Sequence, residues 1–202
     1  MNLDPAALDW DKGAGLLPAI VQDSRNGRVL MQGWMNREAL QQTLQTEKVT
    51  FYSRSKQRLW TKGESSAHWL LLRGAVTDCD ADAILLQAEP QGPTCHLGTA
   101  SCFGEGAAVA VGFLGQLDAL VAGRERERPA GSYTTSLFDA GLRRIAQKVG
   151  EEGVETALAA VVQDEKALLG EAADLLFHLT VLLRARGLGL ADAVAELERR
   201  HG

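Results

Sequence analysis

The segment Thr77-Asp78-Cys79-Asp80-Ala81-Asp82, followed by Pro93-Thr94-Cys95-His96 and Ser101-Cys102-Phe103, is the most informative part of the chain. It contains all three cysteines of the 202 residues. Three thiolates can hold one zinc ion and leave its fourth position open for chemistry, whereas aspartates are oxygen ligands that suit magnesium. Patterns typical of strands precede this segment, and patterns typical of helices follow it. The segment therefore predicts two metal sites near the end of an α+β domain.

The sequence before residue 114 predicts an α+β domain with a mostly antiparallel sheet and one helix. Asn36 can cap a helix that extends to about Lys48. The stretch 89–103 contains two prolines and two glycines, which favour a functional loop. Runs rich in β-branched and aromatic residues are typical of strands, and they occur at 19–23, 29–35, 49–53, 58–62, 68–77 and 84–88.

The sequence after this point predicts an all-α helical bundle, so we expect two domains, 1–114 and 115–202, joined through 104–106 and 109–115. Ser136 with Asp139 forms a capping pair for a long helix, and Asp164 can cap the next one. Four helices of modest length form a thin core, which favours pairing with a second copy. Apolar residues at helical spacing indicate helices at 114–123, 136–163, 164–186 and 190–200, with the charged stretch 124–128 ending the first.

Composition narrows the function classes. The net charge of −5 argues against a nucleic-acid surface and against a polybasic membrane surface. No apolar stretch approaches the ~18 residues of a membrane helix, and the first residues lack the pattern of a signal peptide. An odd number of cysteines excludes a complete disulfide framework, which favours a reduced, cytoplasmic chain.

The residues of the metal motifs have alternative interpretations. Free cysteines are commonly small buried apolar residues, but Cys95 and Cys102 lie in a Gly/Pro/Thr/Ser loop and not in an apolar stripe. His96 is either a proton-transfer group or a loop histidine with one hydrogen bond. The aspartates of 77–82 would share one face of a continuing strand and repel one another unless a cation joins them, whereas in a turn they would be solvated.

The segment 51–66 is the obvious anion site in an acidic chain. Arginine and lysine supply positive charge, and serine hydroxyls and turn amides can bind phosphate oxygens. The alternative is a polar hairpin whose basic side chains extend into solvent. The candidate substrate-binding residues are Ser53, Arg54, Ser55, Arg58, Lys62, Ser65 and Ser66.

Residues 16–103 resemble phosphoribosyl-AMP cyclohydrolase, the enzyme of the third step of histidine biosynthesis. The resemblance implies hydrolytic opening of the adenine six-membered ring by zinc-activated water, which attacks the carbon beside the ribosylated nitrogen. It rests on the stretches FYSRSKQRLWTKGESS (51–66), DCDAD (78–82), AEPQGPTCH (88–96) and SCF (101–103).

The same resemblance implies the ligands of both metals. His96 is then the candidate for proton transfer. The sequence departs from the expected pattern at Ala67, where a glycine is expected before His68. The implied zinc ligands are Cys79, Cys95 and Cys102, and they are shared across a dimer interface. The implied magnesium ligands are Asp78, Asp80 and Asp82.

A second acidic constellation lies on the predicted helices: Glu151, Glu152, Glu155, Glu171 and Asp174. Residues three apart share a helix face, and an acidic face is most often simply solvated. However, Asp174 is followed by Leu175-Leu176-Phe177, so its face borders the core. Carboxylates that converge in a bundle need divalent cations, so we expect magnesium here. Lys148 lies one turn before Glu152 and could neutralise developing charge.

Residues 115–202 resemble phosphoribosyl-ATP pyrophosphatase, the second step of the same pathway, through 133–156 and 170–183. This resemblance implies that a water bound to magnesium attacks a phosphorus of the triphosphate, with Glu152 and Lys148 as catalytic residues. The product of this reaction is the substrate of the first domain. The two resemblances together imply a fused bifunctional enzyme of histidine biosynthesis that acts, as a homodimer, on phosphoribosyl-ATP and phosphoribosyl-AMP.

Two other functions remain open from the sequence. The helical half shares its carboxylate pattern with general nucleoside-triphosphate pyrophosphatases, and activity on ordinary triphosphates would favour that function. The whole chain could also be a zinc-stabilised interaction module on a dimerisation domain. That alternative predicts a zinc with four protein ligands, His96 closing the site, and no turnover.

Overall fold

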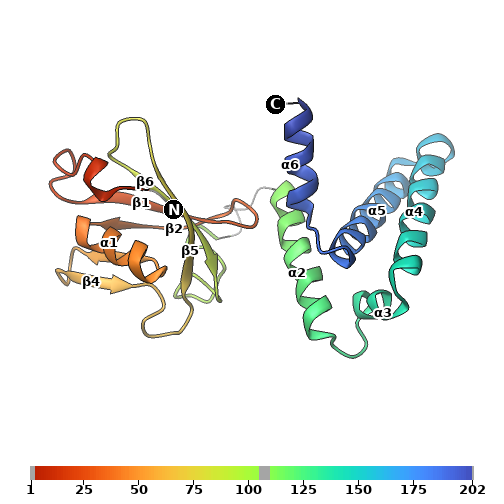
Figure 1. Cartoon of the computed structure of the whole chain (residues 1–202), viewed down its shortest axis with the longest axis horizontal. Coiled ribbons are helices and arrows are strands. Elements are labelled where there is room, and N and C mark those ends of the chain that lie inside the picture. Colours follow the sequence, from red (N-terminus) through yellow and green to blue (C-terminus); the bar gives the residue numbers. More distant parts are fainter. Residues whose placement is uncertain (1–2, 105–109, 202) are drawn as a thin grey trace. The chain divides into compact units, whose positions relative to one another are not determined.

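The computed structural model describes residues 3–104 and 110–201, which form two compact units, Met1–Phe113 and Leu114–Gly202 (Figure 1). Residues 105, 106 and 109 of the expected junction lie outside the described residues.

A four-stranded sheet forms the centre of the first unit. β1 is antiparallel to β2, β5 is antiparallel to β6, and the central pair, β1 and β6, is parallel. The mostly antiparallel character expected from the sequence therefore holds for the outer pairs, and the central pair is the exception. In spatial order the strands are β2 (Val29–Met35), β1 (Leu17–Asp23), β6 (Ile84–Pro90) and β5 (Leu70–Thr77).

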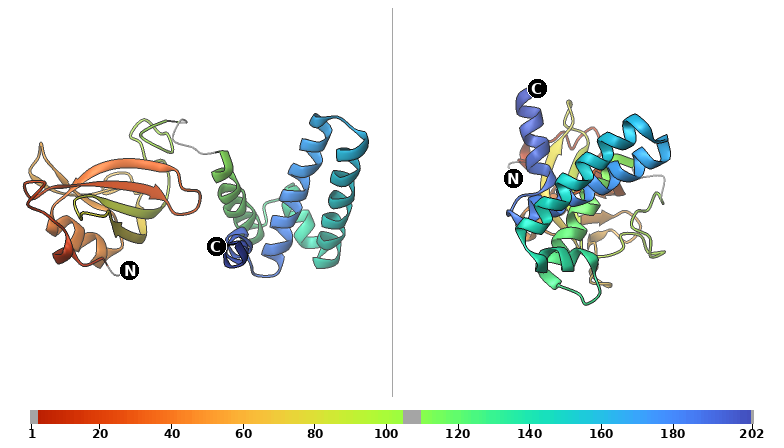
Figure 2. Two further views of the ribbon diagram at one scale, coloured as in Figure 1. Left: turned by 90° about the horizontal axis from the view of Figure 1, so that it is seen from above. Right: turned by 90° about the vertical axis from the view of Figure 1, so that its right-hand side faces the viewer.

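A two-stranded sheet, one α-helix and the short 3-10 helix Pro5–Ala7 complete this unit, and Figure 2 gives two further views of the chain. The strands are β3 (Thr50–Ser53) and β4 (Arg58–Thr61), which pair in antiparallel fashion. Helix α1 (Arg37–Thr46) packs against β3. The Ala39 N–H donates to Asn36 Oδ1 at 2.8 Å, which confirms the predicted cap. The helix ends two residues earlier than expected, because Glu47 adopts a left-handed conformation with φ of 55°.

Both sheets and α1 share one apolar core. Leu17, Ala19 and Val21 on β1 are all buried and alternate with more exposed residues, as one face of a strand requires. From the smaller sheet, Phe51 enters this core and stacks on Trp60 with ring centroids 5.4 Å apart.

Gly33 on β2 is required for the two sheets to approach each other. A Cβ added there would lie 2.3 Å from the ring of the buried Phe51. We therefore expect Gly33→Ala to lower the free energy of unfolding by about 1–3 kcal/mol through overpacking, measured by urea denaturation. Gly74→Ala is the matched control on another strand. Its Cβ would approach closer than 3 Å only to Oε1 at the flexible end of the Gln87 side chain, so an equal loss in both variants would contradict this explanation.

The second unit is entirely helical. Helices α4 and α5 run side by side in opposite directions, and an ion pair between Arg184 and Asp118 ties α5 to α2 (Figure 1). After the short 3-10 turn Ala110–Gly112, the helices are α2 (Phe113–Glu127), α3 (Tyr133–Ala140), α4 (Leu142–Val162), α5 (Glu165–Ala185) and α6 (Leu190–His201).

Two predictions for this unit are wrong. The expected helix 136–163 is interrupted at Gly141, whose φ of 85° and ψ of 171° separate α3 from α4, and the N-cap is Ser132, not Ser136. The charged stretch 124–128 does not end the first helix, which continues to Glu127. In contrast, Asp164 caps α5 as predicted, accepting from the Ala167 N–H at 2.8 Å.

The core of the second unit is small, with Val121, Leu137, Ile145 and Val181 at its centre. Much apolar surface on the α4–α5 pair is instead exposed. The most exposed apolar side chains of these two helices are Val154, Leu158, Val161, Val162 and Leu169. Within the described residues, no helix combines the length and apolar character that a membrane span requires.

Candidate active sites

The loop after β6 brings Cys95 and Cys102 to one cavity of about 610 Å³. Backbone and side-chain bonds fasten this loop to β2. The Cys102 N–H donates to Leu30 O at 2.8 Å, and the Ser101 hydroxyl donates to Val29 O at 2.8 Å. Within the loop, the Cys95 N–H donates to Thr99 O at 3.0 Å. Both cysteines are therefore held at the end of the sheet by defined contacts.

Polar and ionisable side chains line the same cavity. His96 Nδ1 lies 3.8 Å from Cys95 Sγ. Lys62 is buried, and its Nζ donates to the His68 carbonyl at 3.5 Å. Thr94 is only 3% exposed, and its hydroxyl has no hydrogen-bond partner among the described residues. A buried polar atom without a partner costs about 1–3 kcal/mol, which indicates a place for a polar ligand.

The two thiols differ in their proton affinity. Hydrogen bonds from the Leu97 backbone and the Thr99 side chain lower the pKa of Cys95. Burial and the neighbouring Cys95 raise the pKa of Cys102, against the opposing charge of Lys62. The cavity thus combines two closely placed sulfur atoms, a cation and a histidine, which suits a soft metal with an open position.

Cys79 does not join the other two cysteines. Among the residues the structure describes, the three thiols do not form a group with ligand atoms within 4.8 Å of one another. Cys79 is exposed and lies in the turn that follows β5. Within one chain, the structure therefore supplies two of the three expected zinc ligands at the cavity.

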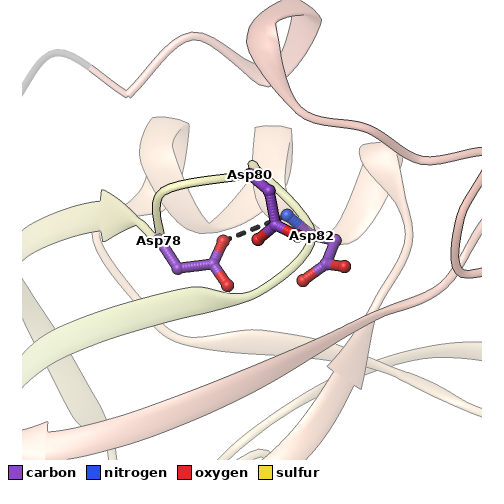
Figure 3. A group of neighbouring side chains, drawn as sticks. All are labelled: Asp78, Asp80 and Asp82. Carbon is purple, nitrogen blue, oxygen red and sulfur yellow. Dashed lines mark hydrogen bonds between the residues drawn. The ribbon is translucent and has the colours of Figure 1, made fainter.

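The three aspartates form a group in the turn between β5 and β6 (Figure 3). The strand ends at Thr77, so they do not share a strand face as they would on a continuing strand. Asp78 Oδ1 accepts from the N–H groups of Asp82 and Ala83, each at 3.1 Å, and these bonds lower the pKa of Asp78. One oxygen from each of Asp78, Asp80 and Asp82 lies within 4.8 Å of the others.

A lysine from the first residues of the chain reaches this turn. Lys12 Nζ lies 2.8 Å from Asp80 Oδ2 and 3.5 Å from Asp82 Oδ2, and these carboxylates raise the pKa of Lys12. The Asp9 N–H donates to Ala81 O at 2.8 Å, which anchors the same turn. The ammonium group of Lys12 thus balances part of the negative charge of this turn.

The predicted anion segment divides between two cavities. Lys62 and Ser66 line the cysteine cavity. Arg54 and Ser55 line neither of the two cavities: the exposed Arg54 guanidinium carbon lies 4.5 Å from the centre of the Trp34 ring, and the Ser55 hydroxyl is 3.5 Å from that of Ser53. A second cavity of about 400 Å³ is lined by Ser53, Arg58 and Ser65 together with Trp34, Lys56 and Trp60.

Sequence reasoning missed His68, which also lines the cysteine cavity. It is half-buried just before β5, where the sequence predicts only the start of a strand. The departure at Ala67 was the available signal. Ala67 has φ of 59°, the left-handed region that favours glycine, so the chain accepts strain immediately before His68.

In the helical unit, Glu152, Glu155 and Glu171 converge. Their carboxylate oxygens lie within 4.8 Å of one another, and Glu152 is 5% exposed. Desolvation and the like charges of Glu152 and Glu171 raise the pKa of Glu155. Such mutual repulsion is relieved by a divalent cation.

The other predicted residues lie around this group. Lys148 Nζ is 2.5 Å from Glu152 Oε1 and 3.0 Å from Glu151 Oε2, and these carboxylates raise the pKa of Lys148. Glu151 also accepts from Gln147 at 2.7 Å, so it is paired on its own helix. Asp174 is outside the three-glutamate group. Burial lowers the pKa of His178, and the negative charge of Asp174 partly offsets this lowering.

His178 also lies beside the acidic group. Its Nε2 lies 3.7 Å from Glu152 Oε1, and burial lowers the pKa of His178. Tyr133 and Phe177 pack edge-on against its ring, with centroids 6.0 and 5.1 Å away. The first turn of α3 is thereby brought beside the acidic group.

Comparison with known proteins matches both units. Residues 31–104 match the family model described as phosphoribosyl-AMP cyclohydrolase, and residues 114–201 match that described as phosphoribosyl-ATP pyrophosphohydrolase. Proteins named histidine biosynthesis bifunctional protein HisIE are similar over nearly their whole length. The one from Xanthomonas axonopodis pv. citri is 69% identical, covering 98% of this chain and 95% of its own. The one from Escherichia coli K12 is 55% identical, covering 96% and 95%.

These matches favour two hydrolytic activities over a general triphosphate pyrophosphatase or an interaction module. The first unit is a cyclohydrolase acting on phosphoribosyl-AMP, and the helical unit is a pyrophosphatase acting on phosphoribosyl-ATP. The resemblances found in the sequence are therefore confirmed. The chain belongs to the family of bifunctional HisIE proteins of histidine biosynthesis.

Proposed function

We propose that the cyclohydrolase site is completed only in a homodimer, in which Cys95 and Cys102 of one chain and Cys79 of a second copy hold zinc. One observation carries this proposal: Cys95 and Cys102 line the same cavity, whereas Cys79 lies apart from them in the aspartate turn. Two sulfur ligands leave a zinc ion incomplete, and an exposed cysteine on a two-fold partner can supply the third.

The residues of the cavity fit this role. When bound, zinc supplies a water of lowered pKa and polarises the atom that is attacked. His96, beside Cys95, is placed to move a proton, and Trp60 offers an aromatic wall to the purine. Lys62 adds a buried positive charge near the thiolates and the substrate. Closing this cavity with a partner would also exclude water from the reacting ring.

The aspartate turn is our candidate magnesium site of the same unit. Its three carboxylates are hard ligands, and Lys12 currently balances their charge. Binding of the cation requires Lys12 to move aside. The basic residues Arg54, Lys56 and Arg58, with Ser53 and Ser65, are our candidates for the substrate phosphates, because they gather at the second cavity and its edge.

For the helical unit, we propose that Glu152, Glu155 and Glu171 bind magnesium, with Glu151 and Asp174 as further candidate ligands. Magnesium held by these carboxylates would orient a water for attack on phosphorus and would offset the charge of the departing pyrophosphate. Lys148 forms an ion pair with Glu152 in this structure. With magnesium bound to the carboxylates, its ammonium group could pair with the substrate phosphates instead. A cytoplasmic location and a homodimer belong to this proposal as well.

The exposed apolar face of α4 and α5 supports a second copy as partner. Val161 is 80% exposed and Val162 72% exposed, although both belong to the longest helix pair of the unit. A bundle of this size needs further burial for stability.

Mixing two inactive variants tests the shared zinc site. We expect Cys79→Ser and Cys102→Ser homodimers each to lose ring opening. In a heterodimer of the two, one site carries both substitutions and the other carries none. Tandem purification of differently tagged chains should therefore give heterodimers with roughly half the wild-type ring-opening activity and one zinc of full affinity per dimer.

The control is a heterodimer of Cys95→Ser and Cys102→Ser, whose substitutions affect both sites, so it should stay inactive. Inactive Cys79/Cys102 heterodimers, in protein that still releases pyrophosphate, would contradict the shared site. This outcome would not count against the assignment of cyclohydrolase activity to the wild-type protein.

A further inference from the structure

Both histidines of the first unit, His68 and His96, line the same cavity. They come from different parts of the chain. His96 follows Cys95 in the loop after β6, whereas His68 precedes β5. Each ring therefore approaches the cavity from a separate element, so the two can contact different atoms of one substrate.

Two glycines fix the position of His68. A Cβ on Gly92 would lie 2.6 Å from the Cδ2 atom of the His68 ring, so only a glycine allows the ring to pack there. A Cβ on Gly63 would lie 2.7 Å from the His68 carbonyl. Ala67 adds the strained φ of 59° immediately before it. Such constraint on one side chain is typical of a residue held for function and not for packing alone.

The ring of His68 is available to a ligand. Among the described residues, neither ring nitrogen has a hydrogen-bond partner, and the side chain is half-buried. Within the part of the chain that the structure describes, the polar contacts of His68 are made by its backbone: its N–H donates to Ser66 Oγ at 3.3 Å, and its carbonyl accepts from Lys62 Nζ. The unpaired hydroxyl of Thr94 on the same cavity independently indicates a polar ligand at this place.

The chemistry of ring opening needs two proton transfers. One water adds its oxygen to the amidine carbon. The bond between this carbon and the ribosylated ring nitrogen then breaks, and its electron pair stays on that nitrogen. The two protons of the water end on different atoms: one on the exocyclic nitrogen, which becomes the amide nitrogen, and one on the ring nitrogen that leaves. Both nitrogens are bonded to this carbon but point in different directions from it, so two side chains from separate elements can each serve one of them.

We propose that His68 is the second proton-transfer group of ring opening, so that His96 and His68 each carry one of the two protons of the water to one of the two nitrogens. This role rests on the cyclohydrolase activity of the first unit. It assigns a function to a second histidine of the cavity and explains why two glycines hold its position.

His68→Gln tests this role, because glutamine keeps a polar group but cannot carry a proton. We expect kcat for ring opening to fall about 100-fold or more, with KM within about threefold of wild type. Zinc content by elemental analysis, and pyrophosphate release by the helical unit of the same protein, should both remain at wild-type values. These two readouts separate a proton-transfer role from loss of metal or of folding.

Gly92→Ala is a second variant that leaves every titratable group in place. Its methyl group displaces the His68 ring, so kcat for ring opening should again fall while zinc content is kept. Gly15→Ala is the matched control, since Gly15 also has a positive φ of 86° but its added Cβ meets nothing within 4 Å. It should leave kcat unchanged.

The outcomes are distinct. A kcat for His68→Gln within threefold of wild type overturns the proposal, and so does a fall in kcat that only parallels a loss of zinc. Loss of pyrophosphate release as well would show a folding defect, in which case Gly92→Ala against Gly15→Ala decides. Absence of ring opening in the wild-type protein would instead refute the activity on which the proposal rests.

Discussion

Cys102→Ser should abolish ring opening and leave pyrophosphate release intact. Cys102 lies at the cavity beside Cys95, and its sulfur is one of the three ligands proposed for zinc. Serine is a poor zinc ligand, so the metal and its several kcal/mol of transition-state stabilisation are lost together. At about 1.4 kcal/mol per tenfold change, we expect a fall in kcat/KM of at least about 1000-fold.

The measurement follows phosphoribosyl-ATP in one sample, separating pyrophosphate release from appearance of the ring-opened product. In the variant, phosphoribosyl-AMP should accumulate, and zinc per chain should fall. Full zinc content with normal ring opening would remove Cys102 from the site. Loss of both activities would count against two independently folded units.

Glu152→Gln should have the converse effect. Glu152 is buried, its carboxylate belongs to the converging group with Glu155 and Glu171, and it pairs with Lys148 at 2.5 Å. The amide removes one negative ligand, leaves Lys148 without its closest partner and weakens magnesium binding. We expect pyrophosphate release to fall at least about 100-fold, on the scale of losing one group that stabilises transition-state charge.

Ring opening of added phosphoribosyl-AMP is the internal control for Glu152→Gln and should be unchanged. Glu198→Gln, on the exposed face of α6, is the matched substitution and should leave both activities at wild-type values. Normal pyrophosphate release by Glu152→Gln over a range of magnesium concentrations would exclude Glu152 from the catalytic group.

Local signals predicted much of the fold. The cap at Asn36 and the cap at Asp164 each start a helix where expected, because a side-chain oxygen that accepts from the third following N–H can be recognised from sequence alone. Gly141 was harder to interpret. A glycine inside an apolar pattern is compatible with a continuous helix, and only its tertiary surroundings determined that it would separate α3 from α4.

The candidate sites were predicted unevenly for a similar reason. Glu152 and Glu155 converge because three-residue spacing on a helix fixes a common face. No such rule relates Cys79 to Cys95, because they lie on separate loops whose relative placement depends on the sheet topology. His68 was missed since a lone histidine at the start of a strand carries no local pattern.

The parallel pairing of β1 with β6 has a consequence for how this enzyme can be shortened or recombined. The recognisable family match starts at residue 31, yet β1 lies wholly before it and forms the middle of the sheet. The segment ahead of β1 also delivers Lys12 to the aspartate turn. A shuffled gene or minimal enzyme cut where this family match begins would thus lose its central strand, so inheritance of this activity has to include the residues before 31.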